Sequence, residues 1–134
     1  MSLENVEVVR RAFAPGQEGD FEGYMSALDP EIEWDGTRAV PDTTVAHGHE
    51  AVRNACRRWF GAWENDFEVQ AEEILELAPD KLLVVVHDSG TAKGTGITID
   101  RRNFQIWEIR DGLAVRLRVF LDRAEALEAA GLSE

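Results

Sequence analysis

The chain has 134 residues, of which 26 are acidic and 14 basic, so its net charge at pH 7 is −12. A surface this acidic repels phosphate backbones and anionic lipid, which argues against nucleic acid or a membrane as a partner. The length predicts a single domain over residues 1–134, and no apolar run approaches the roughly 20 residues that cross a bilayer. Cys56 is the sole cysteine and the N-terminus lacks a signal-peptide pattern, so we expect a cytoplasmic protein without an internal disulfide.

Helical periodicity dominates the first half of the chain. Three helices are expected. The first begins near Ser2 and ends at Pro15-Gly16, and the second begins at the N-cap Asp20 and ends at Asp29-Pro30. The third runs from about His49 to about Trp63. A short strand over residues 32–35 and a loop over residues 36–48 separate the second helix from the third.

The second half of the chain reads as strands. We expect long strands over residues 67–77, 81–91, 97–110 and 113–121, with a bulge at Glu72-Glu73 in the first of them. Asp111-Gly112 is a strong two-residue hairpin signal between the last two strands. A closing helix over residues 124–130 follows, with Gly131 as its C-cap.

This order of elements predicts the α+β class rather than a parallel α/β sheet. Long strands interrupted by glycines and a bulge curl strongly. We therefore expect a cone-shaped, strongly curved antiparallel sheet wrapped around the N-terminal helices, with an apolar pocket at one end of the cone.

Short strings spread along the chain point to a family. They are residues 4–11 (ENVEVVRR), 19–21 (GDF), 28–34 (LDPEIEW), 48–53 (GHEAVR), 110–112 (RDG) and 121–127 (LDRAEAL). In this order they resemble the SnoaL-like branch of the nuclear-transport-factor-two-like superfamily. The resemblance implies an α+β barrel with a cone-shaped pocket and a homodimer formed through the outer sheet face. The superfamily includes ketosteroid isomerases, polyketide cyclases, limonene-epoxide hydrolases, scytalone dehydratases and non-enzymatic binding modules.

The resemblance also implies a candidate base. Asp35 matches the position of the carboxylate base of the ketosteroid isomerases, which removes a proton next to a carbonyl. The two oxyanion donors of those enzymes would fall near Ala12 and Gln105, which are different residue types here. An aspartate of the epoxide hydrolases would fall at Val119, so both of these active sites are incomplete. Asp88 could supply a carboxylate, but the sequence does not tell which face it occupies.

Strand alternation sorts the other pocket candidates. If Gln105 faces the pocket, so do Asn103, Trp107 and Ile109, and on the final strand Val115, Leu117, Val119 and Leu121 do so too. The opposite face would carry Phe104, Ile106, Glu108, Arg116, Arg118 and Phe120. One apolar strand beside a mixed one suits a hydrophobic ligand with one polar end.

Several candidates have a purely structural alternative. Asp35 could cap the turn at Gly36, and His47 could belong to the start of the third helix rather than to the pocket. The tryptophans Trp34, Trp59 and Trp63 could line the pocket or fill the core. The three histidines, His47, His49 and His87, lack the spacing of a metal site, and no motif for a phosphate or nucleotide is present, so no metal or cofactor is expected.

Two functions follow. The first is cofactor-free acid–base catalysis, as an isomerase, cyclase or hydrolase, on a hydrophobic polycyclic or terpenoid-like molecule, with Asp35 as base and Gln105 or His47 orienting an oxygen. The second is a non-enzymatic ligand-binding or dimerisation module of the same fold. In either case the expected ligand-binding residues are Trp34, Trp59, Trp63, Asn103, Trp107, Leu117, Val119 and Leu121. The homodimer would form through Phe104, Ile106, Arg116, Arg118 and Phe120.

Overall fold

The computed structural model describes residues 2–16, 21–39 and 43–131, and these form four helices and six strands. The helices are α1 (Ser2–Gly16), α2 (Phe21–Ser26), α3 (Gly48–Gly61) and α4 (Arg123–Ala129). The strands are β1 (Leu28–Asp35), β2 (Ala46–His47), β3 (Glu68–Ala78), β4 (Lys81–Thr91), β5 (Thr98–Arg110) and β6 (Leu113–Phe120). The expected N-cap Asp20 lies outside the described residues. No helix within those residues is long and apolar enough to span a membrane.

The strands form one sheet in the order β2-β1-β6-β5-β4-β3. The α+β prediction is confirmed, but the sheet is mixed rather than purely antiparallel, because β1 runs parallel to β6. The other neighbouring pairs are antiparallel. The local hairpin signals concern β3 to β6, which follow one another along the chain. Nothing local indicates the direction in which the distant strand β1 joins β6.

Strand β1 begins earlier than expected and contains Pro30. Its pairing with β6 is irregular between Leu28 and Glu33, so Pro30 lies where few ladder hydrogen bonds are formed. The Asp29 carboxylate accepts the backbone N–H of Glu31 at 2.8 Å and stabilises this local turn. Helix α2 ends at Ser26, before the Asp29-Pro30 pair that was expected to end it, and that pair lies inside β1.

The β5–β6 hairpin and the bulge in β3 follow the sequence signals. Asp111 and Gly112 both have positive φ, 54° and 79°, which is the backbone that a tight two-residue hairpin requires. The register of β3 on β4 shifts between Ala71 and Glu73, where the alternation of apolar residues breaks. Both features are confirmed.

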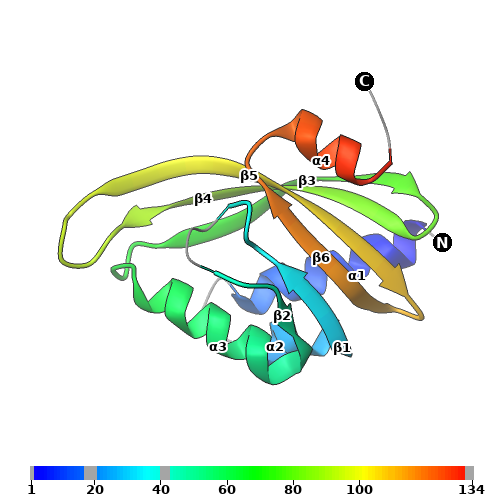
Figure 1. Ribbon diagram of the computed structural model, residues 1–134, viewed down its shortest axis with the longest axis horizontal. Coiled ribbons are helices and arrows are strands. Elements are labelled where there is room, and N and C mark those ends of the chain that lie inside the picture. The colour runs from blue at the N-terminus through cyan, green and yellow to red at the C-terminus, as the bar shows by residue number, and fades with distance from the viewer. Residues whose placement is uncertain (1, 17–20, 40–42, 132–134) are drawn as a thin grey trace.

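The sheet has an inner face covered by α1, α2 and α3, and an outer face covered in part by α4 (Figure 1). The inner core contains Leu82, Val84, Val86, Trp107, Ile109, Leu117 and Val119 together with Val9, Met25 and Val52 of the helices. The outer core joins Leu83, Ile106 and Phe120 to Ala126 and Ala130. The expected alternation along β5 is thus confirmed, because Trp107 and Ile109 lie inside while Ile106 lies outside.

Helix α4 covers part of the outer face that was predicted to form the homodimer interface. Ile106 is fully buried and Phe120 is 4% exposed, because both pack against α4 of the same chain. These two side chains are therefore unavailable to a second copy. The sequence predicted α4 but contained no signal for the face on which it packs.

Gly90 in β4 allows the chain after α3 to approach the sheet closely. A Cβ atom at Gly90 would lie 2.8 Å from Cδ1 and 3.0 Å from Cα of Phe67. Phe67 in turn stacks on Trp63, with ring centroids 5.2 Å apart. The aromatic cluster at this end of α3 thus depends on a position without a side chain.

We expect Gly90→Ala to lower the free energy of unfolding by about 1–3 kcal/mol, because the methyl group would push against the backbone of Phe67. Urea denaturation would measure the loss. The matched control is Gly61→Ala at the end of α3, where a Cβ atom would meet nothing within 4 Å. That variant should be neutral or more stable by up to about 1 kcal/mol. Equal stability of the two variants would contradict the close approach.

Candidate functional site

A cavity of about 450 Å³ lies between α3 and the inner face of the sheet. This volume is typical of sites for small organic ligands. Most of its wall is apolar and comes from α1, α3 and the strands β1, β3, β4 and β6: Ala12, Phe13, Trp34, Trp59, Phe60, Val69, Val86 and Val119. An apolar pocket at the open end of the sheet was expected from the sequence, and the cavity has that character.

One side of the cavity carries a polar strip from β4 and β5. It consists of Asp88, Arg101, Asn103 and Gln105, all of which line the cavity. The last three are two residues apart on β5, so they share one face, and Asp88 is in register with Arg101 across the β4–β5 pair. The strip is a consequence of strand geometry, because alternation and register together place four polar side chains side by side.

The strip is connected by hydrogen bonds. The indole N–H of Trp107 donates to Oε1 of Gln105 at 2.9 Å, and Nε2 of Gln105 donates to Oδ1 of Asn103 at 2.9 Å. Nδ2 of Asn103 then donates to Oδ1 of Asp88 at 3.4 Å. We call this series the amide relay; it begins at Trp107 and ends at the carboxyl group of Asp88.

Asp88 is the buried carboxyl group of the cavity, with 4% of its surface exposed. Burial raises its pKa above the ordinary value, since the charged form loses hydration, and the nearby guanidinium of Arg101 and the amide of Asn103 oppose this shift. Nε of Arg101 lies 3.6 Å from Oδ1 of Asp88. The same guanidinium lies over the ring of Trp59, 5.4 Å from its centroid. A carboxylate with a raised pKa is a stronger base than an ordinary aspartate and can return the proton that it accepts.

Tyr24 and Cys56 add two uncharged groups to the wall. The indole N–H of Trp34 donates to the hydroxyl of Tyr24 at 3.1 Å, which leaves the hydroxyl hydrogen of Tyr24 for donation. Burial raises the pKa of Tyr24 and raises the pKa of Cys56 to about 12. Cys56 is therefore a neutral thiol rather than a nucleophile. Tyr24 belongs to α2, whereas the resemblance placed an oxyanion donor near Ala12 of α1.

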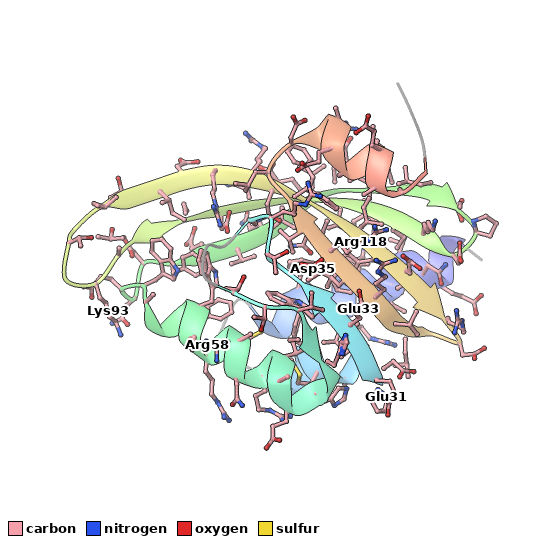
Figure 2. The ribbon with its side chains drawn as sticks, in the orientation of Figure 1. Glu31, Glu33, Asp35, Arg58, Lys93 and Arg118 are labelled. Carbon is pink, nitrogen blue, oxygen red and sulfur yellow. The ribbon has the colours of Figure 1, made fainter. Side chains whose placement is uncertain are left out.

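Asp35 was predicted to lie in the pocket as the base, but it caps a turn instead. Its carboxylate accepts the backbone N–H of Thr37 at 3.0 Å and the hydroxyl of Thr37 at 2.6 Å, so it caps the turn after β1. It is not among the residues that line the cavity, whereas its neighbour Trp34 is. Alternation along β1 turns Asp35 to the other face, where it is in register with Arg118 of β6 (Figure 2). The structural alternative for Asp35 is thus the observed one.

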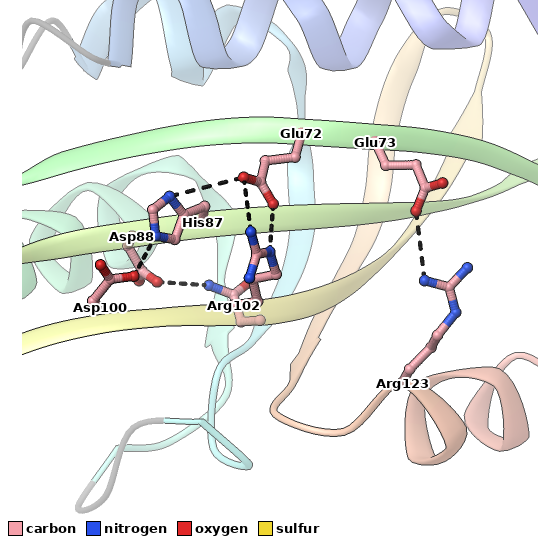
Figure 3. A network of polar contacts seen from close by, with 8 residues as sticks. Glu72, Glu73, His87, Asp88, Asp100, Arg102 and Arg123 are labelled. Atoms are coloured by element: carbon pink, nitrogen blue, oxygen red, sulfur yellow. Dashed lines mark hydrogen bonds and ion pairs between the residues drawn. The ribbon is translucent and has the colours of Figure 1, made fainter.

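His47 also lies outside the cavity wall. Its side chain is 71% exposed and its Nε2 is 3.9 Å from Oε1 of Glu33. It is the N-cap residue of α3 without a side-chain capping bond. His87 lies beside Asp88 in sequence but on the outer face of β4, where it contacts Glu72 and Asp100 (Figure 3).

The remaining predicted ligand contacts divide into two groups. Trp34, Trp59, Asn103 and Val119 line the cavity, as does Gln105. Trp63, Trp107, Leu117 and Leu121 do not, and each has a physical reason. Trp63 stacks on Phe67 past the end of α3. Trp107 and Leu117 are fully buried, and the ring of Trp107 lies against Phe13 and Tyr24. Leu121 follows the end of β6 and is 46% exposed.

Comparison with known proteins identifies the family and the fold. A family model described as the SnoaL-like domain matches residues 9–117. No match was found among curated proteins. Among solved structures, an NTF2-like protein from Burkholderia thailandensis is 23% identical, with a TM-score of 0.77 over 95% of this chain and 96% of its own.

Two further solved structures carry functional descriptions. A putative SnoaL-like polyketide cyclase from Jannaschia sp. is 21% identical, with a TM-score of 0.75 over 90% of this chain and 86% of its own. A Mycobacterium tuberculosis protein in complex with estradiol-17β-hemisuccinate is 20% identical, with a TM-score of 0.71 over 90% of this chain and 95% of its own. At these identities the similarity establishes the fold.

Proposed function

The chain belongs to the SnoaL-like domain family, and we propose that it binds a hydrophobic small molecule in the cavity and transfers a proton on it without a cofactor. Asp88 is the proposed acid–base group, in place of the Asp35 expected from the sequence. The observation that carries this proposal is a buried carboxyl group with a raised pKa on the wall of an otherwise apolar cavity.

The reaction that suits this arrangement is proton transfer next to a carbonyl. The carboxylate of Asp88 takes a proton from the carbon beside the carbonyl group, and the electrons of the broken C–H bond move into the enolate, with its charge on oxygen. In a β,γ-unsaturated ketone the enolate is a dienolate, and the carboxyl group of Asp88 returns the proton to its γ carbon, which moves the double bond into conjugation with the carbonyl. Alternatively the enolate attacks a second carbonyl, which closes a ring, and the carboxyl group of Asp88 gives its proton to the alkoxide that forms. Both outcomes balance without an oxidant or a metal.

The class of ligand follows from the cavity and is supported by the related structures. The wall offers the aromatic rings of Phe13, Trp34, Trp59 and Phe60, which suit flat, apolar ring systems. The Mycobacterium tuberculosis relative was solved with a steroid ester, and the Jannaschia relative is described as a polyketide cyclase. A polycyclic or terpenoid-like substrate with one carbonyl end fits the present cavity.

A second candidate is a binding protein without turnover. It is favoured by the residues at the positions where the resemblance places catalytic groups, since Ala12, Gln105 and Val119 cannot ionise and Asp35 caps a turn. This function would use the same cavity and the same class of ligand. The two candidates differ in whether Asp88 exchanges protons with the bound molecule.

Ligand binding in the cavity is tested with estradiol-17β-hemisuccinate and calorimetry. Ala55 of α3 lines the cavity, so Ala55→Phe should fill part of it and weaken binding at least about tenfold. The matched control is Ala62→Phe at the exposed end of α3, which should stay within about twofold of the wild type. Absence of wild-type binding at about millimolar ligand, or equal binding by both variants, would contradict the proposal.

We also propose the homodimer, now restricted to the part of the outer face that α4 leaves uncovered. Arg116 and Arg118 of β6 lie there and form ion pairs with Glu33 and Glu108. A cytoplasmic location is supported by the single cysteine, Cys56, which is buried.

A further inference from the structure

In the amide relay, the donors and acceptors present determine which atom of each side-chain amide faces its neighbour. The indole nitrogen of Trp107 is a donor and never an acceptor, and it lies 2.9 Å from the side-chain amide of Gln105. The atom of Gln105 that faces it must therefore be the oxygen. The amide nitrogen of Gln105 then faces Asn103 at 2.9 Å, so Asn103 must present its own oxygen there and direct its nitrogen toward Asp88.

A reversed amide would be unfavourable at every step. Turning the Gln105 amide over would bring its NH₂ group against the indole N–H of Trp107 and its oxygen against the oxygen of Asn103. Two hydrogen bonds would be replaced by two repulsive contacts in a setting where Asn103 is 4% exposed and Trp107 fully buried. The relay is therefore held in one orientation.

This orientation leaves spare donors in the cavity. Each amide nitrogen carries two hydrogens, and the relay uses one from Gln105 and one from Asn103. Among the hydrogen bonds of the described residues, neither of the second hydrogens has an acceptor, and both side chains line the cavity. Nε of Arg101 is buried beside them, 3.6 Å from Oδ1 of Asp88 and beyond hydrogen-bond distance of it.

We propose that the cavity selects ligands whose polar end is a hydrogen-bond acceptor, a ketone or enolate oxygen, which receives the spare amide hydrogens of Gln105 and Asn103. Trp107 is the positioning residue for this selection: it is not in the cavity wall, yet its indole N–H determines which way both amides point. The inference rests on the proposed function and extends it by assigning the carbonyl oxygen of the ligand to Gln105 and Asn103 and the orientation of these two amides to Trp107.

The placement suits the chemistry at Asp88. The amide donors and the carboxyl group belong to the same strip, so an oxygen held by Gln105 and Asn103 keeps the adjacent carbon of the ligand on the Asp88 side of the cavity. An enolate oxygen carries more charge than a ketone oxygen, and amide donors aimed at it therefore stabilise the enolate more than the ketone.

Two probes of nearly equal shape test this selection. They are 2-tetralone, a bicyclic ketone, and 2-methylenetetralin, in which a CH₂ group replaces the carbonyl oxygen. Calorimetry gives the affinity of each, and the ratio of the two affinities is compared between variants, which removes the difference in hydration of the probes. Side-chain amide NMR signals of Asn103 and Gln105 report the contact directly.

Gln105→Glu keeps the shape of the side chain but exchanges its donor for an acceptor, so it should lower the ratio of ketone to alkene affinity about tenfold. Gln70→Glu makes the same chemical change at an exposed position of β3 and should leave the ratio within about twofold. Trp107→Phe keeps an aromatic ring but removes the indole N–H, and it should lower the ratio while the alkene affinity stays unchanged. In the wild type the amide signals should move with 2-tetralone only.

Failure of the inference and failure of the proposed function give different results. If Gln105→Glu leaves the ratio unchanged while both probes bind, the inference is wrong and the proposed function stands. If neither probe binds to the wild-type chain, the proposed function fails and the inference fails with it.

Discussion

Asp88→Asn is expected to slow proton exchange at the carbon beside the carbonyl of 2-tetralone at least about a hundredfold. The reason is that the carboxylate of Asp88 is the proposed base, and asparagine has nearly the same shape but cannot accept the proton. The relay can still end on an acceptor, because the asparagine side chain also has an oxygen that Asn103 can reach. The loss should therefore reflect chemistry rather than collapse of the cavity.

The measurement is deuterium incorporation into 2-tetralone, followed by NMR in D₂O and corrected for the exchange without protein. Asp35→Asn is the matched control, since it makes the same change at the carboxylate that caps the turn at Thr37. Exchange by that variant should remain within about twofold of the wild type. If Asp35→Asn stops exchange and Asp88→Asn does not, the base has been assigned to the wrong carboxylate. If neither variant changes the rate of the wild type, Asp88 is not the base. If the wild type gives no exchange above the rate without protein, the binding-protein function holds.

Asp88→Asn should also change how the free energy of unfolding depends on pH. The folded-state pKa of Asp88 is raised above its ordinary value of 3.8, so the folded chain holds this proton more tightly than the unfolded chain. Its contribution to stability is present in full below that ordinary value and is lost as the pH rises through the raised folded pKa. The free energy of unfolding of the wild type, minus that of Asp88→Asn, should therefore fall as the pH rises above 3.8 and become constant above the raised folded pKa.

Trp107→Ala is expected to cost about 3–5 kcal/mol of unfolding free energy, the largest stability effect that we predict. The side chain is fully buried and packs against Phe13 and Tyr24, with ring centroids 6.0 and 6.5 Å away. Its removal leaves a cavity and also deprives the oxygen of Gln105 of its donor. Urea denaturation at neutral pH measures the loss.

The control for Trp107→Ala is Leu121→Ala. Both residues were expected to line the pocket, but Leu121 is 46% exposed, so its truncation should cost less than about 0.5 kcal/mol. A similar cost for both substitutions would contradict the packing of Trp107 behind the cavity wall.

Much of the fold could be predicted because local rules determine it. The positive φ values at Asp111 and Gly112 and the bulge beside Glu73 follow from turn chemistry and from a break in alternation. The parallel pairing of β1 with β6 and the packing of α4 over Ile106 could not be predicted, because each joins segments far apart in the chain. A local pattern shows which face of an element is apolar but not which element covers it.

The site could be predicted in part, and both errors concern the face of a strand on which a carboxyl group lies. The resemblance placed Gln105 in the pocket, and Asn103 was then placed correctly because residues two apart on a strand share a face. Asp88 follows an unbroken apolar run, Leu82 to Val86, which is buried on both faces and therefore carries no alternation from which to read its direction. Asp35 was placed by resemblance, and a shift of one position along β1 turns a side chain to the opposite face.

The sequence by itself determined the class of fold, the hairpin and the alternation of faces along β5, because these depend on periodicity and turn chemistry within short segments. The tertiary structure alone decided that Asp88, rather than Asp35, lies on the cavity wall, and that Trp107 orients the amides from behind it. Those features depend on the register between β4 and β5 and on hydrogen bonds between residues that only the folded sheet brings into contact. The chemistry proposed for this chain therefore follows from strand register, which no single segment contains.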